Sequence, residues 1–149
     1  MKALVYVAAL APDEGETVGD VFYRAKPHPL APKPEPDRHG LIYLPNEAFA
    51  AAFAQNASAA QLSLLRAVQR PISPACITVP VGRPLWKDRP AWFLIAEQDR
   101  MIATETQHFM AERMRARVRS YPVDHAPIVT APELVVDIIR AAIAEAPSA

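Results

Sequence analysis

Two apolar runs of strand length, residues 2–8 and 92–96, limit the possible folds of this chain more than any other feature. The first reads KALVYVA and is followed by Pro12 and Gly15, and the second reads WFLIA. Short continuous apolar runs bounded by turn residues are typical of strands buried on both faces of a parallel sheet. Helices cover both faces of such a sheet, so we expect strands and helices to alternate along the chain.

The rest of the sequence supplies those helices and a third strand. We predict helices over residues 45–55, 58–69 and 104–115, a strand over residues 118–121 and a last helix from residue 130. Ser58 with Gln61, and Thr104 with Gln107, have the spacing of a capping box, which marks the start of a helix. This order predicts the α/β class, with three parallel strands and flanking helices.

The segment between the first two strands is expected to form a separate cap. Residues 27–36 contain five prolines, which excludes a helix or an interior strand there. Residues 9–91 are also too many for a single crossover helix. We therefore assign residues 1–16 and 91–149 to the core, and residues 17–90 to a Pro-rich connector and a helical cap insertion.

Charge and cysteine content exclude several classes of protein. The 149 residues include 16 Lys and Arg against 16 Asp and Glu, so the chain lacks the basic surface expected of a nucleic-acid or membrane-surface binder. Cys76 cannot form an internal disulfide, no metal-ligand spacing is visible, and the first ten residues are too short for a membrane span. The sequence predicts a cytoplasmic protein with no metal or cofactor and with no nucleic-acid or membrane partner.

Two polar residues follow neighbouring strands and are the candidate site. Asp99 lies in IAEQDR after the second strand, and His125 lies in PVDHAP after the third. Parallel strands end at one rim of a sheet, so a carboxylate and an imidazole would meet there, as in a Ser-His-Asp triad. In the alternative interpretations Asp99 is a turn or capping residue and His125 an ordinary loop histidine. Asp124 is the less favoured partner of His125, because adjacent side chains of an extended segment point apart.

Three stretches of this sequence resemble the C-terminal half of the α/β-hydrolases. They are ALVYVAALAPDEGE, AWFLIAEQDRMIATETQHFM and VRSYPVDHAPIVTAPELVVDII, and they are similar to the branch with plant methylesterases, salicylate-type esterases and hydroxynitrile lyases. The resemblance implies a partial α/β-hydrolase fold in which Asp99, with Gln107 behind it, is the triad acid and His125 is the triad base. Hydroxynitrile lyases have Lys directly after that His. Ala126 at this position favours an esterase-type protein that acts on a small carboxylic ester.

The family's nucleophile motif, G-x-S-x-G, is absent from the sequence. The four glycines are Gly15, Gly19, Gly40 and Gly82, and none lies two residues from a serine. We therefore expect the isolated chain to be inactive and to need a partner that supplies the serine and the oxyanion-hole amides. The alternative is a noncatalytic, truncated association module, which forms a homo-oligomer or binds another chain through residues 2–8 as an open sheet edge.

Other reactive and aromatic residues have structural interpretations. Cys76 follows Pro74 in the cap and is expected to be a small buried residue rather than a nucleophile. Three histidines lack companion ligands and are expected at the surface: His28, His39 and His108. Four aromatic residues either line an acyl pocket under the cap or belong to the core: Phe49, Phe53, Trp86 and Trp92.

Overall fold

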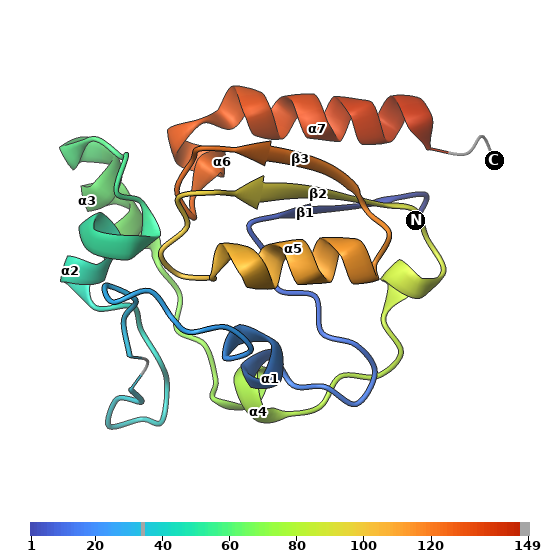
Figure 1. The fold of residues 1–149 in the computed structure, drawn as a ribbon. Coiled ribbons are helices and arrows are strands. Elements are labelled where there is room, and N and C mark those ends of the chain that lie inside the picture. Colours follow the sequence, from blue (N-terminus) through green and yellow to red (C-terminus); the bar gives the residue numbers. More distant parts are fainter. Residues whose placement is uncertain (34, 147–149) are drawn as a thin grey trace.

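The computed structural model describes residues 1–33 and 35–146 and shows a sheet between two helices, with a cap at one end (Figure 1). The elements are β1 (Leu4–Val7), α1 (Val18–Phe22), α2 (Asn46–Ala48), the π-helix η1 (Phe49–Phe53), α3 (Ala59–Val68), α4 (Ala75–Thr78), the 3₁₀ helix η2 (Leu85–Lys87), β2 (Ala91–Ala96), α5 (Thr104–Arg113), β3 (Arg117–Tyr121), α6 (Pro127–Thr130) and α7 (Pro132–Glu145). The predicted α/β class and the order of its elements are confirmed.

The sheet has the strand order β1-β2-β3, and both pairs of neighbours are parallel. Leu4 of β1 pairs with Ala91, and Ala96 at the end of β2 pairs with Tyr121. Every residue of the central strand β2 is buried, whereas the β1 side chains are only half-buried. The difference arises because β1 is an outer strand, which pairs on one side only within the described part of the chain.

Helices α7 and α5 cover opposite faces of the sheet (Figure 1). Successive residues of β2 point to opposite faces, so the strand contributes to two apolar layers. Trp92 and Leu94 pack in the layer that includes Ile138 of α7, and Phe93 packs in the layer that includes Met110 of α5. The end of β2, from which the next loop begins, is therefore packed on both faces.

The cap consists of α1 to α4 and η1, with α2 and α3 beyond the ends of β2 and β3 to which their arrows point (Figure 1). The Pro-rich connector forms no helix among its described residues, and Pro34 lies outside them, as do residues 147–149 of the predicted core. Ser58 and Gln61 form the predicted capping box.

The prediction of one regular α-helix over residues 45–55 was wrong. The chain makes a short α-helical turn and then the π-helix η1, in which Ala54 N–H donates to Phe49 O at 2.8 Å. The Arg100 guanidinium donates to Ala51 O at 2.8 Å, so a side chain from another loop bonds a carbonyl in this widened turn. Tertiary contact, which local sequence does not encode, thus accompanies the change of helix type.

Three smaller predictions also need correction. Helix α5 has Ala103 as its N-cap with no side-chain cap, because Gln107 turns into the core instead of bonding Thr104. The last helix, α7, begins at Pro132 and not at Thr130, which instead ends the separate short helix α6. Cys76 is exposed rather than buried, since α4 lies on the surface of the cap and buries none of its residues.

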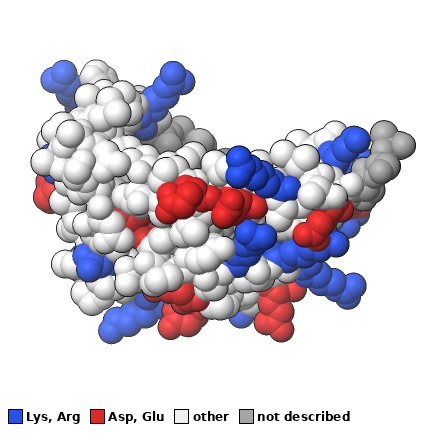
Figure 2. Space-filling model, turned by 90° about the horizontal axis from the view of Figure 1, so that it is seen from above, with Lys and Arg blue, Asp and Glu red and all other residues white. Residues whose placement is uncertain are grey.

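Acidic and basic side chains lie interspersed on the face seen from above in Figure 2. This face includes α7, on which Val136, Ile139 and Ile143 are exposed. Within residues 1–33 and 35–146, no helix has both the length and the apolar character needed to cross a membrane.

Candidate active site

Asp99 lies in the turn that follows β2, and one carboxylate oxygen organises that turn. Its Oδ1 accepts hydrogen bonds from Met101 N–H at 2.7 Å and from Ile102 N–H at 3.0 Å. The Asp99 side chain has no exposed surface. The interpretation of Asp99 as a turn residue is therefore confirmed, and it leaves the second oxygen, Oδ2, free for another partner.

That partner is His125, in the loop between β3 and α6. Its Nδ1 lies 2.9 Å from Asp99 Oδ2, and 18% of its side chain is exposed. The predicted meeting of the two residues at one rim of the sheet is confirmed, because β2 and β3 are parallel neighbours. An Nδ1–H that donates to the carboxylate leaves the lone pair on Nε2, which is the protonation state that a general base requires. The catalytic role of the pair stays a prediction.

Gln107 of α5 holds the acid in place from behind. Its Nε2 donates to Asp99 Oδ2 at 2.8 Å and to Ile102 O at 3.2 Å, and its Oε1 accepts from Ala96 N–H at 3.1 Å. The side chain is completely buried. The resemblance placed Gln107 behind Asp99, but the capping-box spacing suggested a different contact. The available sequence signal was a glutamine among the buried positions of a helix next to the acid.

The remaining carboxylate and histidine candidates, which are Asp124, His28, His39 and His108, do not hydrogen-bond this pair. Asp124 is buried, but its carboxylate bonds backbone amides and a threonine hydroxyl and not His125, which agrees with the expectation that adjacent side chains diverge. His108 is exposed, with Nε2 3.4 Å from a Glu97 carboxylate oxygen, and His28 and His39 are exposed as predicted.

An apolar cavity of about 500 Å³ adjoins His125. Phe49 and Phe53 of η1 line it together with Met101 and Ile102 of the turn after β2, which we call the acid loop because it contains Asp99. The rings of Phe53 and His125 meet edge to face, with centroids 5.1 Å apart. A pocket of this volume and character suits the apolar part of a small organic molecule.

Only two of the four aromatic candidates line that cavity. Phe49 and Phe53 do so, and the structure places Trp86 and Trp92 in the two apolar layers beside the sheet. Sequence could not separate these cases because all four side chains are large and aromatic.

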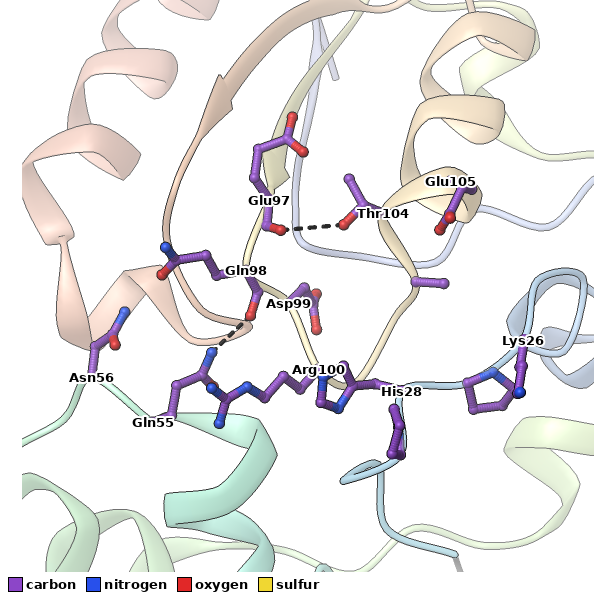
Figure 3. Close-up of a pocket in the computed structure, with 13 residues that line it drawn as sticks. Lys26, His28, Gln55, Asn56, Glu97, Gln98, Asp99, Arg100, Thr104 and Glu105 are labelled. Atoms are coloured by element: carbon purple, nitrogen blue, oxygen red, sulfur yellow. Dashed lines mark hydrogen bonds between the residues drawn. The ribbon is translucent and has the colours of Figure 1, made fainter.

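A second, more polar cavity of about 690 Å³ lies where the cap meets the acid loop. Figure 3 shows Gln55 and Asn56 of the cap facing Gln98, Asp99 and Arg100 across it. Gln55 Nε2 donates to Gln98 O at 2.7 Å. The cap is therefore bonded directly to the loop that carries the acid.

The described residues present neither a metal cluster nor a nucleophile at His125. No group of three or more His, Cys, Asp or Glu side chains in that part of the chain has the arrangement to hold a metal ion. Across residues 1–33 and 35–146, no serine, threonine or cysteine side chain hydrogen-bonds the His125 ring.

The chain thus has a parallel α/β sheet with a buried carboxylate and an imidazole paired beyond its strand ends, which is the arrangement that the resemblance to the α/β-hydrolases implies. A sequence profile of the alpha/beta hydrolase family matches residues 1–138, and the chain belongs to this family. No curated protein matches this sequence at a significant level.

Solved structures confirm the fold. Polyneuridine aldehyde esterase superposes with a TM-score of 0.78 at 16% identity, over 97% of this chain and 63% of that one. A pyrethroid hydrolase from Sphingobium faniae JZ-2 gives 0.77 at 20% identity, over 97% and 61%, and a methylesterase from Arabidopsis gives 0.70 at 12% identity, over 97% and 59%. The chain thus spans about three fifths of the length of these structures, and the predicted partial α/β-hydrolase fold is confirmed.

Proposed function

We propose that this chain carries the acid and base of an esterase-type active site, with His125 as the base and Asp99 as its orienting acid. The observation that supports this most directly is the 2.9 Å contact between His125 Nδ1 and Asp99 Oδ2, with the carboxylate fully buried. Gln107 and the turn amides fix the carboxylate, so the imidazole has one preferred orientation toward it.

In the proposed reaction, His125 Nε2 removes the proton of a serine hydroxyl as its oxygen attacks the ester carbonyl. Asp99 stabilises the resulting imidazolium. The tetrahedral intermediate collapses to an acyl-enzyme, and His125 donates the proton to the departing alcohol. Water, deprotonated by the same nitrogen, then releases the carboxylic acid. The serine and the oxyanion-hole amides are proposed to come from another polypeptide segment, because this sequence lacks G-x-S-x-G.

The proposed substrate is a small carboxylic ester with an apolar part that fits the cavity beside His125. Similar structures carry the names esterase, methylesterase and pyrethroid hydrolase. Ala126 is buried and has no amine that could act on a cyanide group, which favours ester hydrolysis over cyanohydrin chemistry.

The test has two parts. The isolated chain is expected to hydrolyse p-nitrophenyl acetate at the rate of its His125→Ala variant. When a G-x-S-x-G segment encoded in frame upstream is joined to it or co-expressed, activity is expected to appear. His125→Ala should then abolish it and Asp99→Asn should lower it by about 10⁴-fold, as for other triads. His108→Ala, which removes an exposed histidine, should leave it unchanged.

Two results would contradict the proposal. Turnover by the isolated chain that disappears in His125→Ala would mean that the nucleophile lies within these residues. A completed protein that keeps its activity in His125→Ala would remove His125 from the reaction.

The second candidate function is association through β1, and the position of this strand as an outer strand supports it. Leu4 N–H and Ala8 N–H donate to Pro90 O and Leu94 O, so the amides of Val5 and Val7 point to the open edge. An apolar edge of this kind accepts another strand, either from a second copy of the chain or from a partner.

Light scattering during size-exclusion chromatography measures the oligomeric state and so tests association through β1. Wild type is expected to elute as a dimer or larger species. Val5→Pro, which removes an outward amide and leaves the β1–β2 bonds intact, should elute as a monomer. A monomeric wild-type protein at its highest soluble concentration would contradict self-association.

A further inference from the structure

The cap is bonded to both loops of the proposed site, through one short segment. On the acid side, Arg100 donates to Ala51 O at 2.8 Å and Gln55 donates to Gln98 O at 2.7 Å, as Figure 3 shows for the second pair. On the base side, the backbone N–H of Asn56 donates to Asp124 Oδ2 at 2.9 Å. Residues 51–56 thus lie across the gap between the turn after β2 and the loop after β3.

Asp124 makes the base-side connection from a completely buried position. Its second oxygen, Oδ1, accepts from the Thr130 hydroxyl at 2.6 Å and from Ala126 N–H at 3.2 Å. No lysine, arginine or histidine of residues 1–33 and 35–146 forms an ion pair with it. Three donors therefore satisfy this carboxylate, and they come from the cap, from the His125 loop and from α6.

The ring of Phe53, three residues before Asn56, meets the His125 imidazole edge to face. We infer that Asp124 is a positioning residue, which fixes the cap against the His125 loop so that the Phe53 ring stays in contact with the imidazole. This inference rests on the proposed function, because it is His125 as the base that is being positioned. Asp99 fixes the hydrogen bond of the His125 ring. The three hydrogen bonds that Asp124 accepts, which we call the Asp124 latch, fix the contact of the ring with Phe53.

Asp124→Asn tests the latch with almost no change in volume. The carboxylate has two acceptor oxygens, whereas the amide has one and presents an NH₂ group in place of the other. Either Asn56 N–H or the donors from Thr130 and Ala126 must then lose their acceptor. If the carbonyl stays with Thr130, two donors face each other at Asn56 and the cap segment separates from the loop.

The experiment is an NMR comparison of the chain as it exists, with no need for catalysis. In wild type we expect nuclear Overhauser contacts between the rings of Phe53 and His125, and ring ¹⁵N shifts of the Nδ1–H tautomer. Asp124→Asn should lose the ring contacts and shift the His125 nitrogens. Thr130→Val, which removes one donor but keeps the Asn56 bond, should retain both signals. Asp137→Asn, on the exposed side of α7, is the matched carboxylate control and should also retain them.

A folded Asp124→Asn variant with unchanged ring contacts and ¹⁵N shifts would overturn the inference. So would equal loss of these signals in Thr130→Val, since Asp124 would then act only through stability. If Asp124→Asn does not fold, hydrogen exchange of the wild-type Asn56 amide tests the inference instead. The Asp124 latch requires this amide to be protected from exchange, and exchange at the rate of a free amide would overturn the inference. Correct NMR signals together with an inactive completed protein would reject the proposed function and leave the latch in place.

Discussion

Replacement of Gln107 by leucine tests whether the buried hydrogen bonds around the acid stabilise the fold as the structure indicates. Leucine has a similar volume but no polar atom, so the variant removes the hydrogen bonds without leaving a large cavity. The Gln107 amide bonds three groups, namely Ala96 N–H, Asp99 Oδ2 and Ile102 O, all in or next to the turn after β2.

The size of the effect follows from what each partner loses. An unsatisfied buried amide such as Ala96 N–H costs about 1–3 kcal/mol, and a hydrogen bond to a charged group such as Asp99 contributes about 1.5–3 kcal/mol. Added apolar burial returns about 1 kcal/mol. We expect Gln107→Leu to lower the free energy of unfolding by about 1.5–5 kcal/mol, which at its upper end is a large part of the stability of an ordinary domain.

Urea denaturation followed by circular dichroism measures this change. Thr106→Val is the matched control, because Thr106 is the preceding residue on α5, is equally buried, and has a hydroxyl with no hydrogen-bond partner in the described structure. Removal of an unpaired buried hydroxyl should leave stability unchanged or raise it by up to about 1 kcal/mol. A loss below about 1 kcal/mol in Gln107→Leu, or an equal loss in Thr106→Val, would refute the reasoning.

Two further predictions concern packing and pH. Ile138 is completely buried against the sheet, so Ile138→Ala should lower the free energy of unfolding by about 2–5 kcal/mol in the same urea assay, whereas Ile143→Ala on the exposed side of α7 should change it little. Hydrogen bonds from the Thr17 hydroxyl and backbone N–H lower the pKa of Asp20 in the folded state. At a pH above the pKa of this group in the unfolded chain, the ionised carboxylate therefore stabilises the fold in full. This stabilisation is lost as the pH falls through the lower pKa of the folded state. The stability advantage of wild type over Asp20→Asn should therefore be constant near neutral pH and shrink below about pH 4, and an advantage that grows in acid would contradict this.

Asp99 shows how one residue can satisfy two interpretations that sequence reasoning treats as alternatives. A post-strand aspartate predicts a turn, and a carboxylate near a histidine predicts a triad acid. Each carboxylate oxygen takes one of these roles: Oδ1 bonds the turn amides, and Oδ2 bonds His125 and Gln107. The turn bonds also aim the second oxygen, so the local structural role prepares the proposed catalytic one.

Local sequence was sufficient to predict the elements that depend on neighbours along the chain. The apolar runs predicted β1 and β2, the Ser58 and Gln61 spacing predicted the start of α3, and the alternation of elements predicted a parallel sheet. From that sheet the meeting of Asp99 and His125 followed, because the ends of adjacent parallel strands converge whatever the details of packing.

Tertiary structure alone decided the contacts between segments that are distant in sequence. Gln107 does not form the predicted capping box, because its amide is hydrogen-bonded to Asp99 and Ala96 in the interior. The π-helix η1 lies where Arg100 donates to the Ala51 carbonyl. Asp124 bonds Asn56, which lies 68 residues away. A buried polar group has no access to water, so it bonds a protein group that lies close to it in the folded structure. Which group that is depends on the assembled fold and not on the local sequence. Periodicity and capping patterns therefore predicted where the helices and strands lie, but not which buried polar groups pair with each other.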